Sequence, residues 1–202
     1  AYVAGDYPRA IALFNVLRPH MGAAAGSRSP AAEAMVSMLR GSEATINWQF
    51  DQVPLHFEHA ADLFDAIGDV RNACSQRLDA AIFYLDIADY PRSELLLRQV
   101  IDLSDRFGFH RLSSVATRSL GSVLRLTGRE TESEQYAHRA IALASIGGDL
   151  RVSGTAHVLL AQLALHRGDL PRAAQEADRG VTDLARIPRF LARALAVQSR
   201  IK

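Results

Sequence analysis

Histidines and a single cysteine are the residues of this chain whose types could support a metal site or a nucleophile. His56 and His59 stand three residues apart on a predicted helix, whereas zinc hydrolases of the His-Glu-x-x-His type place their histidines four apart. No third ligand follows at a recognisable spacing, so exposed or groove-facing histidines are the simpler interpretation. Cys74 has no obvious base partner and takes a small-residue position, which favours a buried apolar role over a nucleophile.

Glycines and turn carboxylates give no further sign of catalysis. The glycines stand singly, or as the pair Gly147-Gly148, and form no phosphate-binding loop. Asp86 and Asp89 lie near a predicted turn, where helix capping explains them. The sequence therefore predicts no enzyme activity, no cofactor and no catalytic or metal site.

Arginines recur at two regular spacings in this sequence. Arg111, Arg118 and Arg125 are spaced by seven, which places them on one helix face with a drift of about 20° per step. Arg71, Arg111 and Arg151 recur every 40 residues. The same face of this helix and its two neighbours carries Ser75, Asp79, Ile82, Val115, Ser122, Thr155, Val158 and Gln162.

These residues predict a groove with a basic centre and apolar flanks. Such a groove suits an extended peptide or a helix that carries a carboxylate, because arginine binds carboxylates through two parallel hydrogen bonds. The alternative is that the arginines only solvate this face, or pair with acids such as Asp79 and Asp86.

The elements that must position this face repeat every 40 residues. Gly68, Gly108, Gly148 and Pro188 mark the period, and glycine after a helix end adopts the left-handed conformation without a Cβ penalty. An Asp-Tyr-Pro-Arg or Asp-Leu-Pro-Arg phrase marks the turns at Asp6, Asp89 and Asp169. The pattern predicts helices over about 7–18, 30–46, 50–67, 69–87, 90–107, 109–127, 130–147, 149–167, 170–187 and 189–202.

Small residues recur at fixed positions within each 40-residue unit. They include Gly41, Ala81, Gly121 and Ala161 in the first helix, and Ala60, Val100, Ala140 and Gly180 in the second. Ala34, Cys74, Ser114 and Gly154 share another slot. Small residues let helices approach closely, so we expect neighbouring units to stack at a constant angle.

At these positions the chain resembles the tetratricopeptide repeat family. Leu120-Gly121, Gly128, Ser133 and Ala140 resemble its pattern of a large-small pair, a turn glycine and two small residues, and the pattern returns 40 residues later. The early aromatic of that family is absent, and the period exceeds its usual 34 residues. The resemblance implies an all-α fold: a right-handed superhelical α-solenoid of stacked antiparallel helix pairs, whose first helices line the concave face.

This resemblance also sets the expected domain organisation. It implies one array over residues 1–202, with units at about 1–28 (partial), 29–68, 69–108, 109–148, 149–188 and 189–202 (partial). Neither end matches a unit boundary, so we expect a fragment of a larger protein. Units of this length resemble those of bacterial regulators such as maltose-regulator-like transcription factors, peptide-pheromone receptors and signalling-kinase tails.

The composition of the chain limits the classes of partner that it is expected to bind. A net charge of +1 gives no bulk electrostatic reason to bind nucleic acid or a membrane, and a hydrophobic content of 49% is enough for a continuous core. One cysteine, no signal peptide and no apolar run of transmembrane length predict a reducing, cytoplasmic location.

The expected function is a protein-interaction scaffold, the regulatory or sensor segment of a larger bacterial signalling protein that binds a protein or peptide on its concave face. One alternative is a receptor for a small ligand or peptide pheromone. Another is an oligomerisation module, because apolar helix faces at Ile11 and Phe14, or at Leu191 and Leu195, would be uncovered at the ends.

Overall fold

The structure is a computed structural model that describes residues 12, 15–16, 19 and 29–201. In this part of the chain there are nine helices and no strand. The helices are α2 (Pro30–Ile46), α3 (Val53–Ala66), α4 (Val70–Asp86), α5 (Tyr90–Phe107), α6 (His110–Leu126), α7 (Glu130–Gly147), α8 (Leu150–His166), α9 (Leu170–Leu184) and α10 (Pro188–Ser199). The predicted helix over 7–18 and the first partial unit lie largely outside the described residues.

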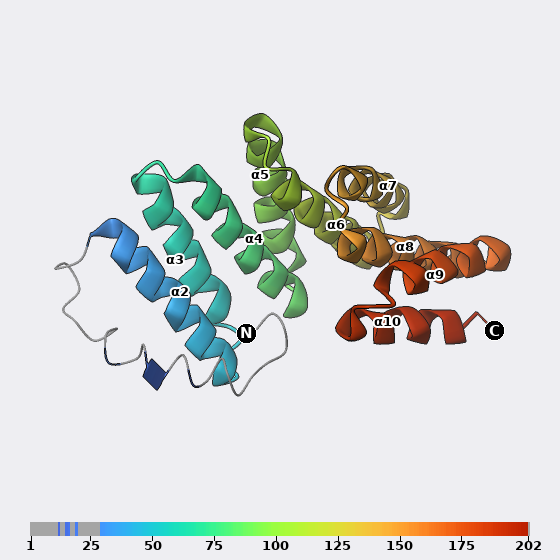
Figure 1. Ribbon diagram of the computed structural model, residues 1–202, viewed down its shortest axis with the longest axis horizontal. Helices are drawn as coiled ribbons and strands as arrows, with labels where there is room; N and C mark the ends of the chain where they lie inside the picture. The colour runs from blue at the N-terminus through green and yellow to red at the C-terminus, as the bar shows by residue number, and fades with distance from the viewer. Residues whose placement is uncertain (1–11, 13–14, 17–18, 20–28, 202) are drawn as a thin grey trace. The chain divides into compact units, whose positions relative to one another are not determined.

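The chain divides after Asp89 into two compact units, and each is described by itself. The first contains α2, α3 and α4, and the second contains α5 to α10. Within each unit, helices that follow one another in the sequence pack against one another (Figure 1). This confirms the predicted all-α, solenoid-like fold; a single array over residues 1–202 stays a prediction.

The predicted 40-residue period is confirmed by the helix starts. The helices α2, α4, α6 and α8 begin at Pro30, Val70, His110 and Leu150, and each is 17 residues long. Left-handed residues occur every 20 positions, at Trp48, Gly68, Ala88, Gly108, Gly128, Gly148 and Gly168. Each of them reverses the chain after a helix, so helix and turn alternate with a fixed spacing.

Aspartates start several of these helices, as the sequence predicts. The carboxylates of Asp69, Asp149 and Asp169 each accept a hydrogen bond from the backbone N–H three residues later, at 3.1 Å. This satisfies a donor that the first helical turn leaves free.

Small residues bring helices together at the predicted positions. A Cβ at Gly154 would lie 2.6 Å from Leu184 Cγ, and a Cβ at Gly180 would lie 2.9 Å from Val158 Cγ2. The two glycines therefore mark a close approach of α8 and α9. Between α6 and α7, the hydroxyl of Ser133 donates to the carbonyl of Gly121 at 2.7 Å. The small-residue slots thus set the spacing of helices within the second unit.

Candidate functional site

Helices α6, α8 and α10 lie next to one another in the second unit. Cα atoms of α6 and α8, and of α8 and α10, approach within 8 Å at several places, although another helix separates each pair in the sequence. Among the described residues, α5, α7 and α9 make no comparably extended backbone contact with one another. The helices of the first set are closer together, so they form the inner side of this unit, and α5, α7 and α9 form its outer side.

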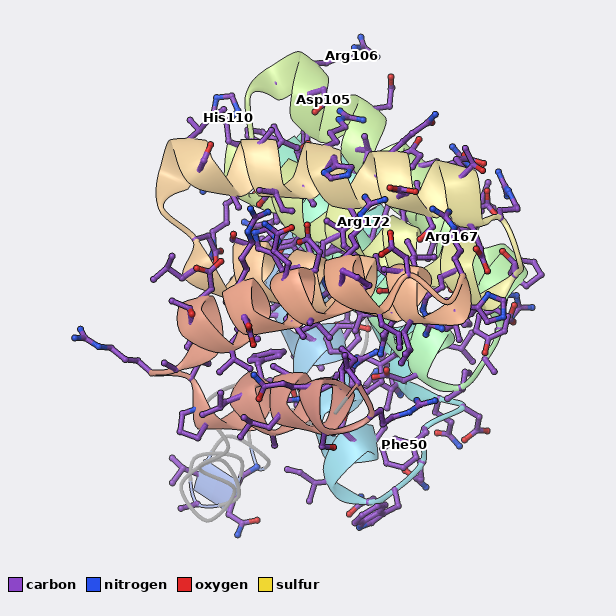
Figure 2. All side chains as sticks on the ribbon, turned by 90° about the vertical axis from the view of Figure 1, so that its right-hand side faces the viewer. Phe50, Asp105, Arg106, His110, Arg167 and Arg172 are labelled. Carbon is purple, nitrogen blue, oxygen red and sulfur yellow. The ribbon has the colours of Figure 1, made fainter. Side chains whose placement is uncertain are left out.

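Long side chains bridge the outer helices. Arg98 on α5 donates to Glu132 on α7 at 2.8 Å, and Glu94 accepts from Arg129 at 2.7 Å. The carboxylate of Glu134 on α7 accepts from Arg172 on α9 and, at 2.5 Å, from Arg167. Figure 2 shows Arg167 and Arg172 in the space between α7 and α9.

These bridges hold the outer carboxylates in their charged form. The hydrogen bond from Arg98 lowers the pKa of Glu132, and the hydrogen bond from Arg167 lowers the pKa of Glu134. Opposite charge and hydrogen bonding both favour a carboxylate over a carboxylic acid. Glu94, Glu132 and Glu134 are therefore paired with arginines of the outer helices and their turns, whereas Glu130 and Glu176 contact His166 and His157 of α8.

The inner helices have a different charge balance. Three arginines lie on α6, one on α8 and two on α10, and none of these helices contains Asp or Glu. The outer helices α5, α7 and α9 contain three acids each. Positive charge is therefore not balanced by carboxylates within the inner helices, which is the condition for attracting an anionic partner.

The structure brings most of the predicted inner-face residues of this unit to two depressions. One has a volume of 40 Å³ and is lined on α6 and α8 by five of them: Arg118, Ser122, Thr155, Val158 and Gln162. The other has a volume of 440 Å³ and includes Arg111 and Arg151. The remaining two are Val115, which is buried, and Arg125, which is partly buried.

Arg125 on α6 is partly buried and lies near another arginine, Arg193. Burial lowers the pKa of its guanidinium, and the positive charge of Arg193 on α10 lowers it further. Its Nε atom is buried and has no hydrogen-bond partner among the residues that the structure describes. A buried donor without a partner costs about 1–3 kcal/mol, so an acceptor supplied by a ligand would be favourable here.

The sequence interpretation missed the contribution of α10. Phe190 and Arg193 line the smaller depression together with the α6 and α8 residues, and the guanidinium of Arg151 lies 5.9 Å from the Phe190 ring centre. Neither residue follows the seven-residue or 40-residue arginine spacing. The available signal was that no acid follows Asp183 in the sequence.

The other four predicted site residues lie on α4, in the first unit. Arg71 is exposed, and Ser75, Asp79 and Ile82 are partly buried. Burial raises the pKa of Asp79 to about 6. Among the described residues, none forms an ion pair with Asp79.

Cys74, the candidate nucleophile, is buried, and His56, a candidate metal ligand, is partly buried. Burial raises the pKa of the Cys74 thiol, which disfavours the reactive thiolate. Burial lowers the pKa of His56. In the described part of the chain, no group of three or more His, Cys, Asp or Glu side chains is arranged to hold a metal ion.

Comparison with known proteins leaves the family open. No protein-family model matches the chain, and a search of curated proteins finds no match. None of the described helices is both long enough and apolar enough to cross a membrane.

Proposed function

We propose that the inner side of the second unit, formed by α6, α8 and α10, binds an acidic peptide or helix of a partner protein. The chain would then act as an interaction scaffold, the regulatory segment of a larger bacterial signalling protein built from long tetratricopeptide-like repeats. One observation carries the proposal: these three helices contain six arginines and no Asp or Glu.

The outer network supports the same assignment. Glu94 on α5 and Glu132 and Glu134 on α7 form ion pairs with Arg129, Arg98 and Arg167, so these three carboxylates are already engaged. An acidic ligand would add carboxylates to a face whose own helices contain none. Phe190, partly buried beside Arg118 and Arg193, would supply apolar contact, the usual source of affinity at the centre of an interface.

A titration of synthetic helices tests the proposal. We expect an amphipathic peptide of leucine and glutamate to bind, and its affinity to fall as salt is raised. Arg125→Ala should weaken binding about tenfold, which corresponds to the loss of one charge-assisted hydrogen bond of about 1.5 kcal/mol or more.

Arg106→Ala is the matched control, because Arg106 lies exposed on α5 and its nearest acid, Asp102 on the same helix, is 4.0 Å away. Figure 2 shows Arg106 at the end of α5. Both variants should keep the parent far-UV circular dichroism spectrum. Equal affinity of Arg125→Ala and the parent would reject the assignment of this face.

A second candidate function is favoured by the larger depression. Its 440 Å³ is within the usual range of small-molecule sites, about 300–1,000 Å³. Arg111 and Arg151 line it together with Leu143, Leu150 and Ile187, and with Asp149, whose carboxylate lies 3.7 Å from Arg151. The two arginines outnumber the one acid, so the site suits a small organic anion with an apolar body. A thermal-shift screen of short-chain carboxylates separates the candidates: a saturable shift that Arg151→Ala abolishes favours a small-ligand receptor.

A further inference from the structure

The turn between α2 and α3 contains a tryptophan in a backbone conformation that favours glycine. Trp48 has φ 61°, and its counterparts 80 and 120 residues later, Gly128 and Gly168, have φ 78° and 76°. The counterpart in between, Ala88, has φ 64°. A bulky L-residue is disfavoured in this region because its Cβ approaches the backbone carbonyl, so the fold alone would favour glycine at position 48.

Packing within the chain does not compensate for this strain. The Trp48 side chain is 79% exposed, Phe50 is 37% exposed, and Leu55 on the first turn of α3 is 53% exposed. The rings of Trp48 and Phe50 meet edge to face with their centres 5.5 Å apart. Figure 2 shows Phe50 on this turn. Trp48, Phe50 and Leu55 are called the aromatic tip below.

The charge around the aromatic tip decides between two kinds of partner. Residues 41–61, which include the turn and the adjoining helix ends, contain no Lys or Arg and three acids, Glu43, Asp51 and Glu58; Arg40 precedes them on α2. Of these, Glu58 accepts a hydrogen bond from the Tyr84 hydroxyl. Asp51 directly follows Phe50 in the same turn and has no ion pair with any described residue. An exposed Trp and Leu would suit a bilayer surface, but carboxylates are repelled by anionic lipids and attracted by a basic protein surface.

We propose that the aromatic tip is a docking surface for a basic, amphipathic segment of a partner protein. Trp48 and Leu55 would enter an apolar pocket of the partner, since tryptophan is the residue most often found at interface hot spots. Arginines of the partner would stack on the exposed faces of Trp48 and Phe50 and reach Asp51. This surface lies in the first unit and does not depend on the proposed function of the second.

Fluorescence offers a direct test, because Trp48 is the only tryptophan of the chain. The probes are an amphipathic helix of leucine and arginine, the same helix with glutamate in place of arginine, and vesicles of phosphatidylserine and phosphatidylcholine. We expect the leucine–arginine helix to shift the Trp48 emission to shorter wavelength in a saturable manner. The glutamate helix and the vesicles should leave it unchanged. No shift with the basic helix, or a shift with the vesicles, would overturn the proposal.

Substitution of Trp48 separates docking from folding. Trp48→Gly should weaken binding of a labelled leucine–arginine helix by about tenfold or more, and it should not lower the unfolding temperature, because glycine occupies the equivalent turns. Ala88→Gly is the matched control: it makes the same backbone change in the next such turn and should leave binding unchanged. Unchanged binding by Trp48→Gly, or an equal loss in Ala88→Gly, would contradict the proposal.

Discussion

The close approach of α8 and α9 makes Gly154→Ala the sharpest test of how the second unit is packed. The new Cβ would lie 2.6 Å from Leu184 Cγ and 2.9 Å from Asp183 Cβ. Neither contact can be relieved at the far end of a flexible side chain, since one atom is a branch point in a fully buried leucine and the other is attached to the α9 backbone. The helix α9 must therefore move away from α8.

The magnitude follows from two opposing effects. Overpacking of this kind costs up to about 3 kcal/mol, and alanine in place of a helical glycine contributes about 1 kcal/mol in the favourable direction. We expect Gly154→Ala to lower the free energy of unfolding by about 2 kcal/mol, measured by urea denaturation followed by far-UV circular dichroism.

Gly147→Ala provides the matched control for this experiment. Gly147 ends α7 and has no neighbouring atom within 4 Å of a built Cβ. This variant should be as stable as the parent or more stable by up to about 1 kcal/mol. If Gly154→Ala left the free energy of unfolding as high as Gly147→Ala does, α8 and α9 would not be in close contact at Gly154.

Three further predictions concern turns and charges. Ala88→Gly should stabilise the chain by about 0.5–1 kcal/mol because φ is 64° at this position, and a lower urea midpoint would contradict that. Asp79→Asn should raise stability at pH 7.5 but have little effect at pH 4. Burial raises the pKa of Asp79 to about 6, so the folded state favours its neutral form, and the penalty shrinks as pH falls below 6 and is gone near the unfolded pKa of about 4. An equal effect of Asp79→Asn at both pH values would refute this. Glu134→Gln should cost about 0.5–1 kcal/mol at low salt and less in 1 M NaCl. Its hydrogen bond from Arg167 lowers the pKa of Glu134, so this contribution is present at neutral pH and is lost as pH falls below about 4; a loss independent of both salt and pH would count against the outer network.

Much of the fold was predictable because the turn residues repeat. Glycines and aspartates at fixed spacing define where helices end and begin, and the helix bounds follow the predicted ranges from Pro30 onward to within about three residues. The left-handed backbone of Trp48 was not predictable from residue type, because only the periodicity of the turns places a tryptophan there. Local sequence identifies a turn, whereas the repeat determines its conformation.

The candidate site was predictable only in part. Helical spacing correctly grouped Arg118 with Ser122, and both line one depression with residues of α8. The same spacing could not show that Val115 is buried, since burial depends on how neighbouring helices pack. Arg193 entered the site through the contact of α10 with α8, which no spacing within one helix encodes.

A calorimetric titration of the acidic leucine–glutamate helix into the full chain tests the central claim most directly. The inner side of the second unit is expected to bind it. A variant with Arg118→Ala, Arg125→Ala and Arg193→Ala should lose about a thousandfold or more in affinity, from about 1.5 kcal/mol or more per charged contact, while its far-UV spectrum stays that of the parent. The same affinity in parent and variant, or no binding by the parent at low salt, would contradict the account.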